Sequence, residues 1–475
     1  MKKKVFAVLL AAVIGICPGA MALIGADAFV SDNEENYIPI PAAYEAVKTV
    51  KNLGGEYGFM NHPEDIFIDG NDTIWIADAE NNRVLKMDTG CNVTGVITEA
   101  CGKTLNKPRG VYVHSDGSIW IADSGNLRIA TLNADESDRR EYMKPESTLL
   151  ENNFTFDVQK IAVAPTGYIY ALKGVNLMTM DETNTFRGYL GADKVGFSLS
   201  RTLIRLFGSK SQIERTQKQQ PASYSNFCIA ADGMIYGILA NKATAQIRKL
   251  NTVGSNTYPE DTYGFVIEMD GKEVEPTFSD ICVEDNGIIT VTDRASGLLY
   301  QYDQEGNLIC CFGGQGSTAG TFQIPISVDA DSEGNLYVLD YSANTLTVFR
   351  PTHFIETVHQ AVTLHGEGRY QEAMVYWQEA LEIDSGYALA HQGVAKIEGK
   401  EEKWSESLRS YYLADDKEGY SDAFSEYRHE YFRNHFLLVV VCAVAILFAA
   451  VKLLGLIKRK GDEWADDVQF GRGLK

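Results

Sequence analysis

An internal repeat of 45 residues constrains the fold of this chain more than any other feature. Residues 62–83 and 107–128 carry the same landmarks in the same order: a proline, a short apolar run, the run Ile-Trp-Ile-Ala-Asp, an asparagine and an arginine. A unit of this size cannot bury both of its faces alone, so several copies must pack against one another. The sequence therefore predicts a repeat architecture.

Four weaker copies follow, each with a short apolar strand and a turn glycine before the next strand. Their apolar strands are residues 161–163, 227–229, 281–283 and 328–330, and their turn glycines are Gly167, Gly233, Gly287 and Gly334. Short β-rich runs that recur every 45 to 66 residues predict four-stranded blades around an axis. We therefore expect a mainly β fold, a six-bladed β-propeller over residues 44–350, in which residues 44–50 close the last blade.

The two clear copies resemble the NHL repeat family, whose unit runs from a proline before the inner strand to an Ala-Asp, small residue, Asn, Arg signature. The matching residues are Pro63, Asp78, Asn81 and Arg83, and then Pro108, Asp123, Asn126 and Arg128. The third and fourth copies lack the aspartate and the arginine. Because Asp and Asn side chains satisfy backbone groups in tight turns, we interpret this signature as scaffold rather than as a ligand site.

The residue just before each inner strand should lie in a ring around one mouth of the central channel. These ring residues are Asp65, Gly110, Lys160, Asn226, Asp280 and Ser327. A mixed ring of this kind suits a polar ligand such as a carbohydrate or a peptide. The candidate ligand-binding residues are Glu64, Asp65, Arg109, Lys160, Asn226 and Asp280. The alternative is that these groups solvate a water-filled channel and pair with one another.

An enzymatic function is the second hypothesis. Some NHL-like propellers are lyases that hold zinc with several histidines, but the propeller segment contains only His62 and His114, too few for a three-histidine site. Propellers that resemble gluconolactonases hold a divalent metal with Glu, Asn and Asp, a set that Glu64, Asn226 and either Asp280 or Asp65 could imitate. The main expectation is a protein without cofactor or catalytic residues. A metal-dependent lactonase or lyase is the alternative.

Both ends of the chain carry membrane-directed segments. Residues 1–28 combine three lysines, an apolar run and small-residue sites, which predicts a signal peptide; an uncleaved anchor is the alternative. Residues 436–457 are apolar apart from Lys452 and are long enough to cross a bilayer. The cluster Lys458-Arg459-Lys460 places the tail, residues 458–475, in the cytoplasm. The expected location is the cell membrane, with one span and the propeller outside the cytoplasm.

Two helical segments complete the predicted organisation. An insertion in the propeller predicts a basic amphipathic helix at about residues 196–220. Residues 354–421 resemble two tetratricopeptide repeats, in which Ala373 and Ala380 let helices approach and Tyr370 and Trp377 fill the groove. Such a segment either binds protein partners or braces the propeller against the span.

The net charge and the architecture limit the classes of partner that this chain can have. A net charge of −21 makes nucleic acid an unlikely partner because the surface repels phosphate. The whole arrangement resembles bacterial NHL-propeller membrane proteins that look like accessory subunits of ABC transport systems for sugars or oligosaccharides. The resemblance implies a non-enzymatic extracytoplasmic propeller that scaffolds a membrane assembly, with a transporter permease as its protein partner.

Overall fold

The structure is a computed structural model that describes residues 28–32, 36–147, 150, 153–190, 223–240, 242, 244–252, 254–269 and 271–469. The chain divides into two compact units, Met1–Leu389 and Ala390–Lys475, which are described separately below. The predicted signal peptide, except Ala28, and the predicted helix at about 196–220 lie outside the described residues.

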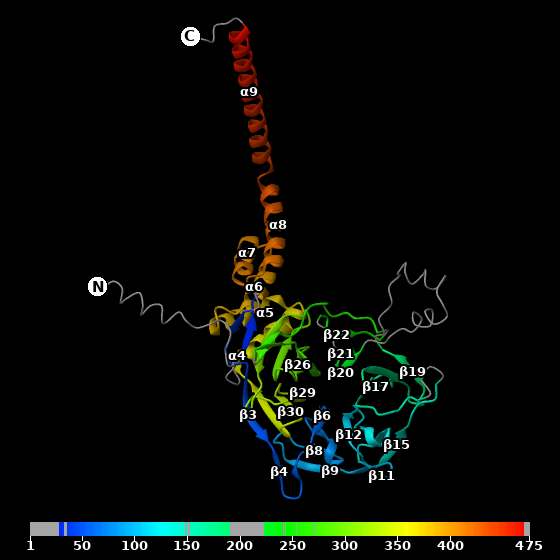
Figure 1. Ribbon diagram of the computed structural model, residues 1–475. Helices are drawn as coiled ribbons and strands as arrows, with labels where there is room; N and C mark the ends of the chain where they lie inside the picture. The colour runs from blue at the N-terminus through cyan, green and yellow to red at the C-terminus, as the bar shows by residue number, and fades with distance from the viewer. Residues whose placement is uncertain are drawn as a thin grey trace, which may run out of the picture. The chain divides into compact units, whose positions relative to one another are not determined.

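Six antiparallel sheets in the first unit follow one another around a central axis in chain order (Figure 1). Their inner strands are β6 (Pro63–Ile68), β12 (Pro108–Val113), β16 (Lys160–Val163), β20 (Tyr224–Ile229), β25 (Phe278–Val283) and β29 (Pro325–Ala330). Each inner strand contacts the next, and β29 contacts β6 to close the ring. The predicted six-bladed, mainly β fold is confirmed.

The outer strands complete the blades in order along the chain. Blades 1 and 2 add β7 (Ile74–Asp78), β8 (Arg83–Met87), β9 (Val93–Ile97), β13 (Ile119–Asp123), β14 (Arg128–Leu132) and β15 (Asp138–Tyr142). Blades 3 and 4 add β17 (Ile169–Lys173), β18 (Asn176–Met180), β19 (Phe186–Tyr189), β21 (Ile235–Leu239) and β22 (Ile247–Leu250). Blades 5 and 6 add β26 (Ile289–Asp293), β27 (Leu298–Tyr302), β28 (Leu308–Gly313), β30 (Leu336–Asp340) and β31 (Thr345–Pro351).

Short hairpins and two 3₁₀ turns decorate the blades. The hairpins are β4 (Asn52–Gly54) with β5 (Gly58–Phe59), β10 (Glu99–Ala100) with β11 (Lys103–Thr104), and β23 (Ile267–Met269) with β24 (Lys272–Val274). The turns are η1 (Ala79–Asn81) and η2 (Ser124–Asn126), which join β7 to β8 and β13 to β14.

The second strand of each blade is buried on both faces because blades stack side by side. In β7, Ile74 and Ile76 pack toward residues of blade 6, including Leu339. The alternating residues, Trp75 and Ala77, pack toward blade 2. Successive side chains of the strand point to opposite faces, and each face packs into a core between two blades. Both faces are therefore buried, which explains why residues 74–77 are all apolar.

Strands from the beginning of the chain complete the last two blades. The predicted closing strand is confirmed as β3 (Tyr44–Val50), which pairs with β31 from Tyr44 opposite Pro351 to Val50 opposite Leu346. The sequence analysis did not predict β1 (Phe29–Ser31) and β2 (Tyr37–Pro39), which extend the sheet of blade 5 through a pair between Phe29 and Cys311. The propeller thus begins before residue 44.

Two helices of the first unit follow the last blade: α4 (His353–Gly366) and α5 (Tyr370–Ile383). The side chain of Thr352 caps α4 by accepting a hydrogen bond from the backbone N–H of Ile355. On α5, Ala373, Trp377 and Ala380 are buried, as the sequence predicted. The tetratricopeptide resemblance itself stays a prediction.

A buried polar chain attaches α4 to blades 5 and 6. His359 Nε2 lies 3.0 Å from Gln301 Oε1, and Gln301 Nε2 donates to the hydroxyl of Tyr44 at 2.9 Å. Burial lowers the pKa of His359 to about 4, so the ring is neutral at neutral pH. Tyr387, after α5, donates its hydroxyl hydrogen to the carbonyl of Ile309 at 2.8 Å. The helices therefore continue the hydrogen-bonded structure of the propeller.

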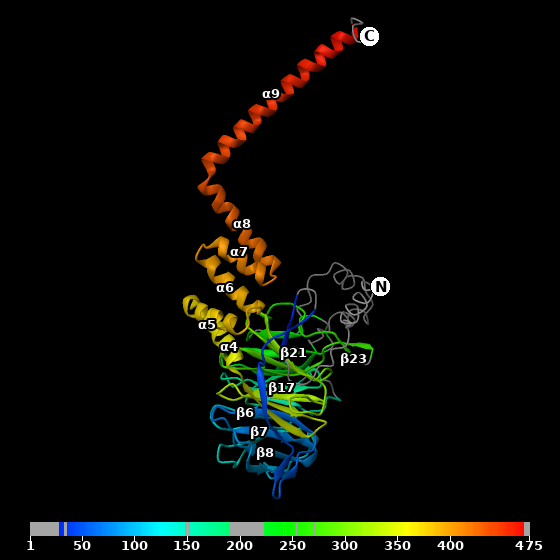
Figure 2. The ribbon, with the colours of Figure 1, turned by 90° about the vertical axis from the view of Figure 1, so that its left-hand side faces the viewer.

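The other helices among the described residues belong to the second unit. They are α6 (Ala388–Lys400, which begins at the unit boundary), α7 (Trp404–Leu413), α8 (Lys417–Asn434) and α9 (Phe436–Gln469). By length and composition, α9 could cross a membrane within Phe436–Ala465, where an 18-residue window has a mean hydropathy of 3.0. Helix α8 ends at Asn434, and the next residue, His435, interrupts the helix with a φ of −112° and a ψ of 17° before α9 begins. Figure 2 shows α8 and α9 meeting at an angle.

The buried His359 predicts acid sensitivity of the propeller. An unfolded histidine binds a proton below pH about 6.5, whereas His359 in the folded chain does so only below about 4, so folding stability falls as the pH drops through this window. The variant His359→Gln replaces the titrating ring by an amide that can still donate a hydrogen bond. In the parent we expect the free energy of unfolding to fall by about 3 kcal/mol between pH 6.5 and 4, and in the variant this fall should be absent. Thermal unfolding of both proteins across this pH range measures the difference. The same dependence of stability on pH in parent and variant would contradict the role of His359.

Candidate functional site

The six inner strands each place one residue in a ring at the end of the channel where these strands begin. The ring residues are Asp65, Gly110, Lys160, Asn226, Asp280 and Ser327, as the aligned repeats predicted. In five of the six strands the pairing register skips one residue immediately before the ring position. Such bulges bend the strand and turn the following side chain toward a new direction. The skipped residues are Glu64, Arg109, Ser225, Ser279 and Ile326.

The ammonium group of Lys160 lies between two carboxylates of the ring. Its Nζ is 2.5 Å from Asp65 Oδ1 and 3.5 Å from Asp280 Oδ1. Ser327 connects the same two aspartates, because its hydroxyl oxygen lies 3.3 Å from Asp65 Oδ1 and also hydrogen-bonds to Asp280 Oδ2. Four of the six ring residues, from blades 1, 3, 5 and 6, thus form one buried cluster.

The same side chains also bind the backbones of neighbouring blades. Asp65 Oδ2 accepts from the N–H of Val111 at 2.9 Å, and Asp280 Oδ2 accepts from the N–H of Val328 at 3.0 Å. The hydroxyl of Ser327 accepts from the N–H of Ile66 at 3.2 Å. In all three cases the donor is the residue directly after the ring position of the next blade. The ring side chains therefore hold consecutive blades together.

The two remaining ring residues act at two further junctions. Asn226 donates to the carbonyl of Ser279 at 3.1 Å, which links blade 4 to blade 5. Gly110 has no side chain, and a Cβ there would lie 2.5 Å from the carbonyl oxygen of Gln159. Only glycine permits this approach of blades 2 and 3.

Burial and the neighbouring charges shift the pKa values within the cluster in opposite directions. Burial raises the pKa of Asp65 to about 6, although the charge of Lys160 and its hydrogen bond lower it. Burial alone would lower the pKa of Lys160, but Asp280 and Asp65 raise it well above its usual value. Lys160 is therefore a permanent cation, and the ring is a charged but internally paired structure.

A second layer of the channel carries further acidic groups that the sequence analysis did not select. Asp329 lies two residues after Ser327 on β29, so it points to the same side of the strand. Its Oδ2 accepts from the N–H of Ile68 at 2.7 Å, and burial raises its pKa to about 7. Alignment of the positions two residues past the ring would have identified it.

Glu284, on the loop after β25, is another carboxylic acid of this region with a raised pKa. Burial raises the pKa of Glu284 to about 8, and the nearby Asp331 raises it further. Its Oε1 is buried without a hydrogen-bond partner within the part of the chain that the structure describes, whereas Oε2 accepts from Asn286 at 3.2 Å. Glu284 is thus protonated over most of the physiological pH range.

The two candidate residues outside the ring form an ion pair on the rim of the mouth. Arg109 Nε lies 2.6 Å from Glu64 Oε2, and the two side chains are 37% and 20% exposed. Both are bulge residues of blades 2 and 1, so the bulges direct them away from the axis. This pair, rather than the ring, faces solvent.

The set considered for a divalent metal is engaged in other bonds. Glu64 pairs with Arg109, Asn226 with a backbone carbonyl, and the ammonium of Lys160 lies between Asp65 and Asp280. Among the described residues, no group of three or more His, Cys, Asp or Glu side chains is arranged to hold a metal ion.

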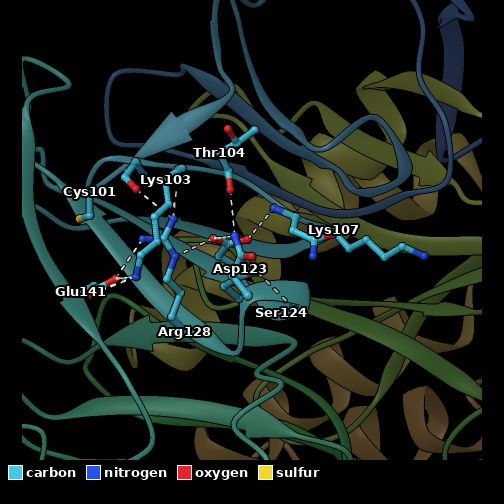
Figure 3. Close-up of polar contacts among 12 residues, drawn as sticks. Cys101, Lys103, Thr104, Lys107, Asp123, Ser124, Arg128 and Glu141 are labelled. Carbon is cyan, nitrogen blue, oxygen red and sulfur yellow. Dashed lines mark hydrogen bonds and ion pairs between the residues drawn. The ribbon is translucent and has the colours of Figure 1, made fainter.

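The NHL signature has the scaffold role that the sequence predicted. Figure 3 shows Asp123 between the side chain of Arg128 and neighbouring groups: Arg128 Nε and Asn126 Nδ2 each donate to Asp123 Oδ2 at 2.8 Å. Asp123 Oδ1 accepts from the N–H of Asn106 at 2.8 Å, and Arg128 also pairs with Glu141 at 3.1 Å. Blade 1 repeats the arrangement with Asp78, Asn81 and Arg83. The Asp carboxylates thus join the turn after the second strand to the backbone of the loop before the inner strand.

A comparison with known protein families identifies the same repeat. Residues 105–132 match the NHL repeat family, which confirms the repeat predicted in blade 2. No curated protein matches the chain in sequence.

Similar solved structures include a streptogramin B lyase, 12% identical over 69% of this chain and 87% of that chain, with a TM-score of 0.38. They also include a catalytically inactive virginiamycin B lyase from Staphylococcus aureus, 13% identical over 63% of this chain and 84% of that chain, with a TM-score of 0.40. A putative gluconolactonase is 11% identical over 66% of this chain and 94% of that chain, with a TM-score of 0.41. Likenesses of this strength carry no information about the reaction or ligand of this chain.

Removal of the ring cation should destabilise the propeller. Lys160→Met leaves Asp65 and Asp280 buried without a counter-charge, so we expect the free energy of unfolding to fall by roughly 3–5 kcal/mol. Adding Asp65→Asn and Asp280→Asn should restore much of this loss. Thermal and urea unfolding of the full chain in detergent measure both effects, with the exposed Lys51→Met as control. Equal stabilities of the Lys160 and Lys51 variants would contradict the cluster.

Neutralisation of Glu284 should stabilise the protein at alkaline pH. The folded chain holds this proton up to pH about 8, while an unfolded glutamate loses it near its usual pKa of about 4.3, so stability falls as the pH rises between these values. Glu284→Gln removes this loss, and its melting temperature should exceed that of the parent at pH 8.5 but not at pH 4. The exposed Glu333→Gln serves as control, and a variant that melts below the parent at pH 8.5 would refute this.

Proposed function

We propose that this chain is a non-enzymatic, membrane-anchored extracytoplasmic propeller that binds a protein partner and scaffolds a membrane assembly. The observation that carries the proposal is the internal pairing of Asp65, Lys160, Asp280 and Ser327. Groups that would act as acids, bases or metal ligands in an enzyme are here occupied in joining blades. This supports a structural role for the channel and directs binding to the surface around its mouth.

The rim of the mouth is the proposed contact surface. The half-exposed pair Glu64 and Arg109 offers one carboxylate and one guanidinium, which suit the polar groups of a protein segment or a carbohydrate. The direction of the strands supports this choice. The inner strand β29 leaves the mouth, β30 returns to it and β31 leaves it again, so α4 follows at the opposite end of the blades. The mouth is therefore not covered by α4 or α5.

The anchoring part of the proposal rests on α9 and on the residues around it. A helix of this length and hydropathy is compatible with a single span, and Lys458, Arg459 and Lys460 favour a cytoplasmic tail. A permease of an ABC transport system for sugars is the proposed partner, on the strength of the resemblance of the architecture. The lactonase or lyase alternative would require the Lys160 ammonium to leave the space between two aspartates, which no observation favours.

Charge reversal at the rim tests the proposal. The full chain, in its native membrane, is crosslinked and its partners are identified by mass spectrometry. We expect a transporter permease in the parent sample and at least a fivefold loss of it in Arg109→Glu. The matched control Arg139→Glu, which changes an exposed arginine on the outer strand of blade 2, should keep the partner. Equal recovery from both variants, or hydrolytic activity that Arg109→Glu abolishes, would count against the proposal.

A further inference from the structure

Helix α8 carries a stripe of exposed aromatic side chains directly before the apolar helix α9. Tyr420, Phe424, Tyr427 and Tyr431 are 39%, 45%, 38% and 48% exposed. Their spacing of four, three and four residues places them within about 60° of one another around the helix axis. Aromatic side chains in such a row on a water-exposed helix indicate a surface that is covered in the working protein.

The other faces of α8 have different environments. Ala423 is buried, and a Cβ on Gly419 would lie 2.3 Å from the ring of Tyr411, so α7 covers the side of α8 next to the stripe. The face opposite the stripe carries only polar side chains: Glu418, Asp422, Ser425, Glu426, His429 and Arg433. The aromatic face is therefore left open by α7 and differs sharply from the polar face.

We propose that the aromatic stripe of α8 lies in the headgroup region of the bilayer that α9 enters. The stripe ends at Tyr431, five residues before Phe436, where the apolar span begins, so the lipid surface is the nearest apolar environment along the chain. Three of the four residues are tyrosines, whose rings favour the boundary between acyl chains and water. The inference rests on the membrane anchoring proposed above.

The dimensions determine how α8 must lie. From Tyr420 to Tyr431 the helix rises about 17 Å, whereas the headgroup layer on each side of a bilayer is only about 5–8 Å thick. An upright α8 would hold most of the stripe in water. The interruption at His435 lets α8 take a different direction from α9 and lie along the surface (Figure 2).

Charge on the flank of the stripe fits the same orientation. Lys417 and Arg428 lie about 50–70° from the axis of the stripe, on the side away from Ala423. Their long side chains can reach lipid phosphates while the aromatic rings enter the boundary layer. Phe432, 47% exposed, lies about 110° from the axis of the stripe, between this flank and the polar face, at the end closest to the span.

A second copy of the chain is the competing occupant, since the same spacing occurs in paired helices. A dry helix–helix seam would bury three tyrosine hydroxyls that need hydrogen-bond partners. The headgroup region supplies water and phosphate to these hydroxyls. The chemistry of the stripe thus favours lipid.

Photocrosslinking in vesicles separates these outcomes. The full chain, reconstituted in vesicles of phosphatidylcholine and phosphatidylglycerol, carries a benzophenone amino acid in place of Phe424 or Tyr431. The matched controls carry it in place of Asp422 or His429 on the polar face, and a reference carries it in place of Leu447 in α9. After irradiation, lipid adducts are counted by mass spectrometry and dimers by gel electrophoresis.

We expect adducts at positions 424 and 431 to exceed those at 422 and 429 at least fivefold, with adducts also at 447. Adducts at 447 with none at 424 and 431, or dimers at 424, would overturn the lipid contact of α8 while leaving the span in place. No adducts at 447 would overturn the anchoring and this inference together.

Discussion

A single buried ammonium group, that of Lys160, joins blades that do not touch through their strands. It bonds to Asp65, 95 residues away in the sequence, and approaches Asp280 from the other side. In a propeller each blade otherwise contacts its two neighbours, so these ion pairs, like the contact of β29 with β6, depend on the complete ring. A ring with another number of blades would separate these groups and leave buried charges unpaired, which costs several kcal/mol. The cluster thus favours the six-bladed closure.

The closure of the outer edge follows a different principle. Strand β3 pairs with β31, and β1 pairs with β28, so residues from the start of the chain hold the last two blades by backbone hydrogen bonds. The buried contact of His359 with Gln301 extends this closure to α4. Charged side chains close the propeller near its axis, and backbone pairing closes it at its circumference.

The local pattern of the sequence was sufficient for the blades and for the ring positions. The runs Ile74–Asp78 and Ile119–Asp123 indicate buried strands, and the aspartates that end them indicate turns held by side-chain hydrogen bonds. The sequence left open whether the ring groups bind a ligand or pair with one another. The particular pair of Lys160 with Asp65 was not predictable, because it depends on distances across the axis that exist only after closure. Strands β1 and β2 have three residues each, too few to show a period, and Pro39 lies within the second. Glu284 is buried by a neighbouring blade, which its own strand does not reveal.

The pairing of β3 with β31 has a consequence for the order of events during synthesis. The residues of β3 leave the ribosome almost 300 residues before their partner strand, since Thr49 faces Thr347 in the finished sheet. The early strand must therefore remain unpaired while five and a half blades are made, and the chain cannot be sealed until its last blade is present. Loop closure over this distance is slow compared with pairing inside a blade. Closure of the ring should therefore follow the formation of the individual blades.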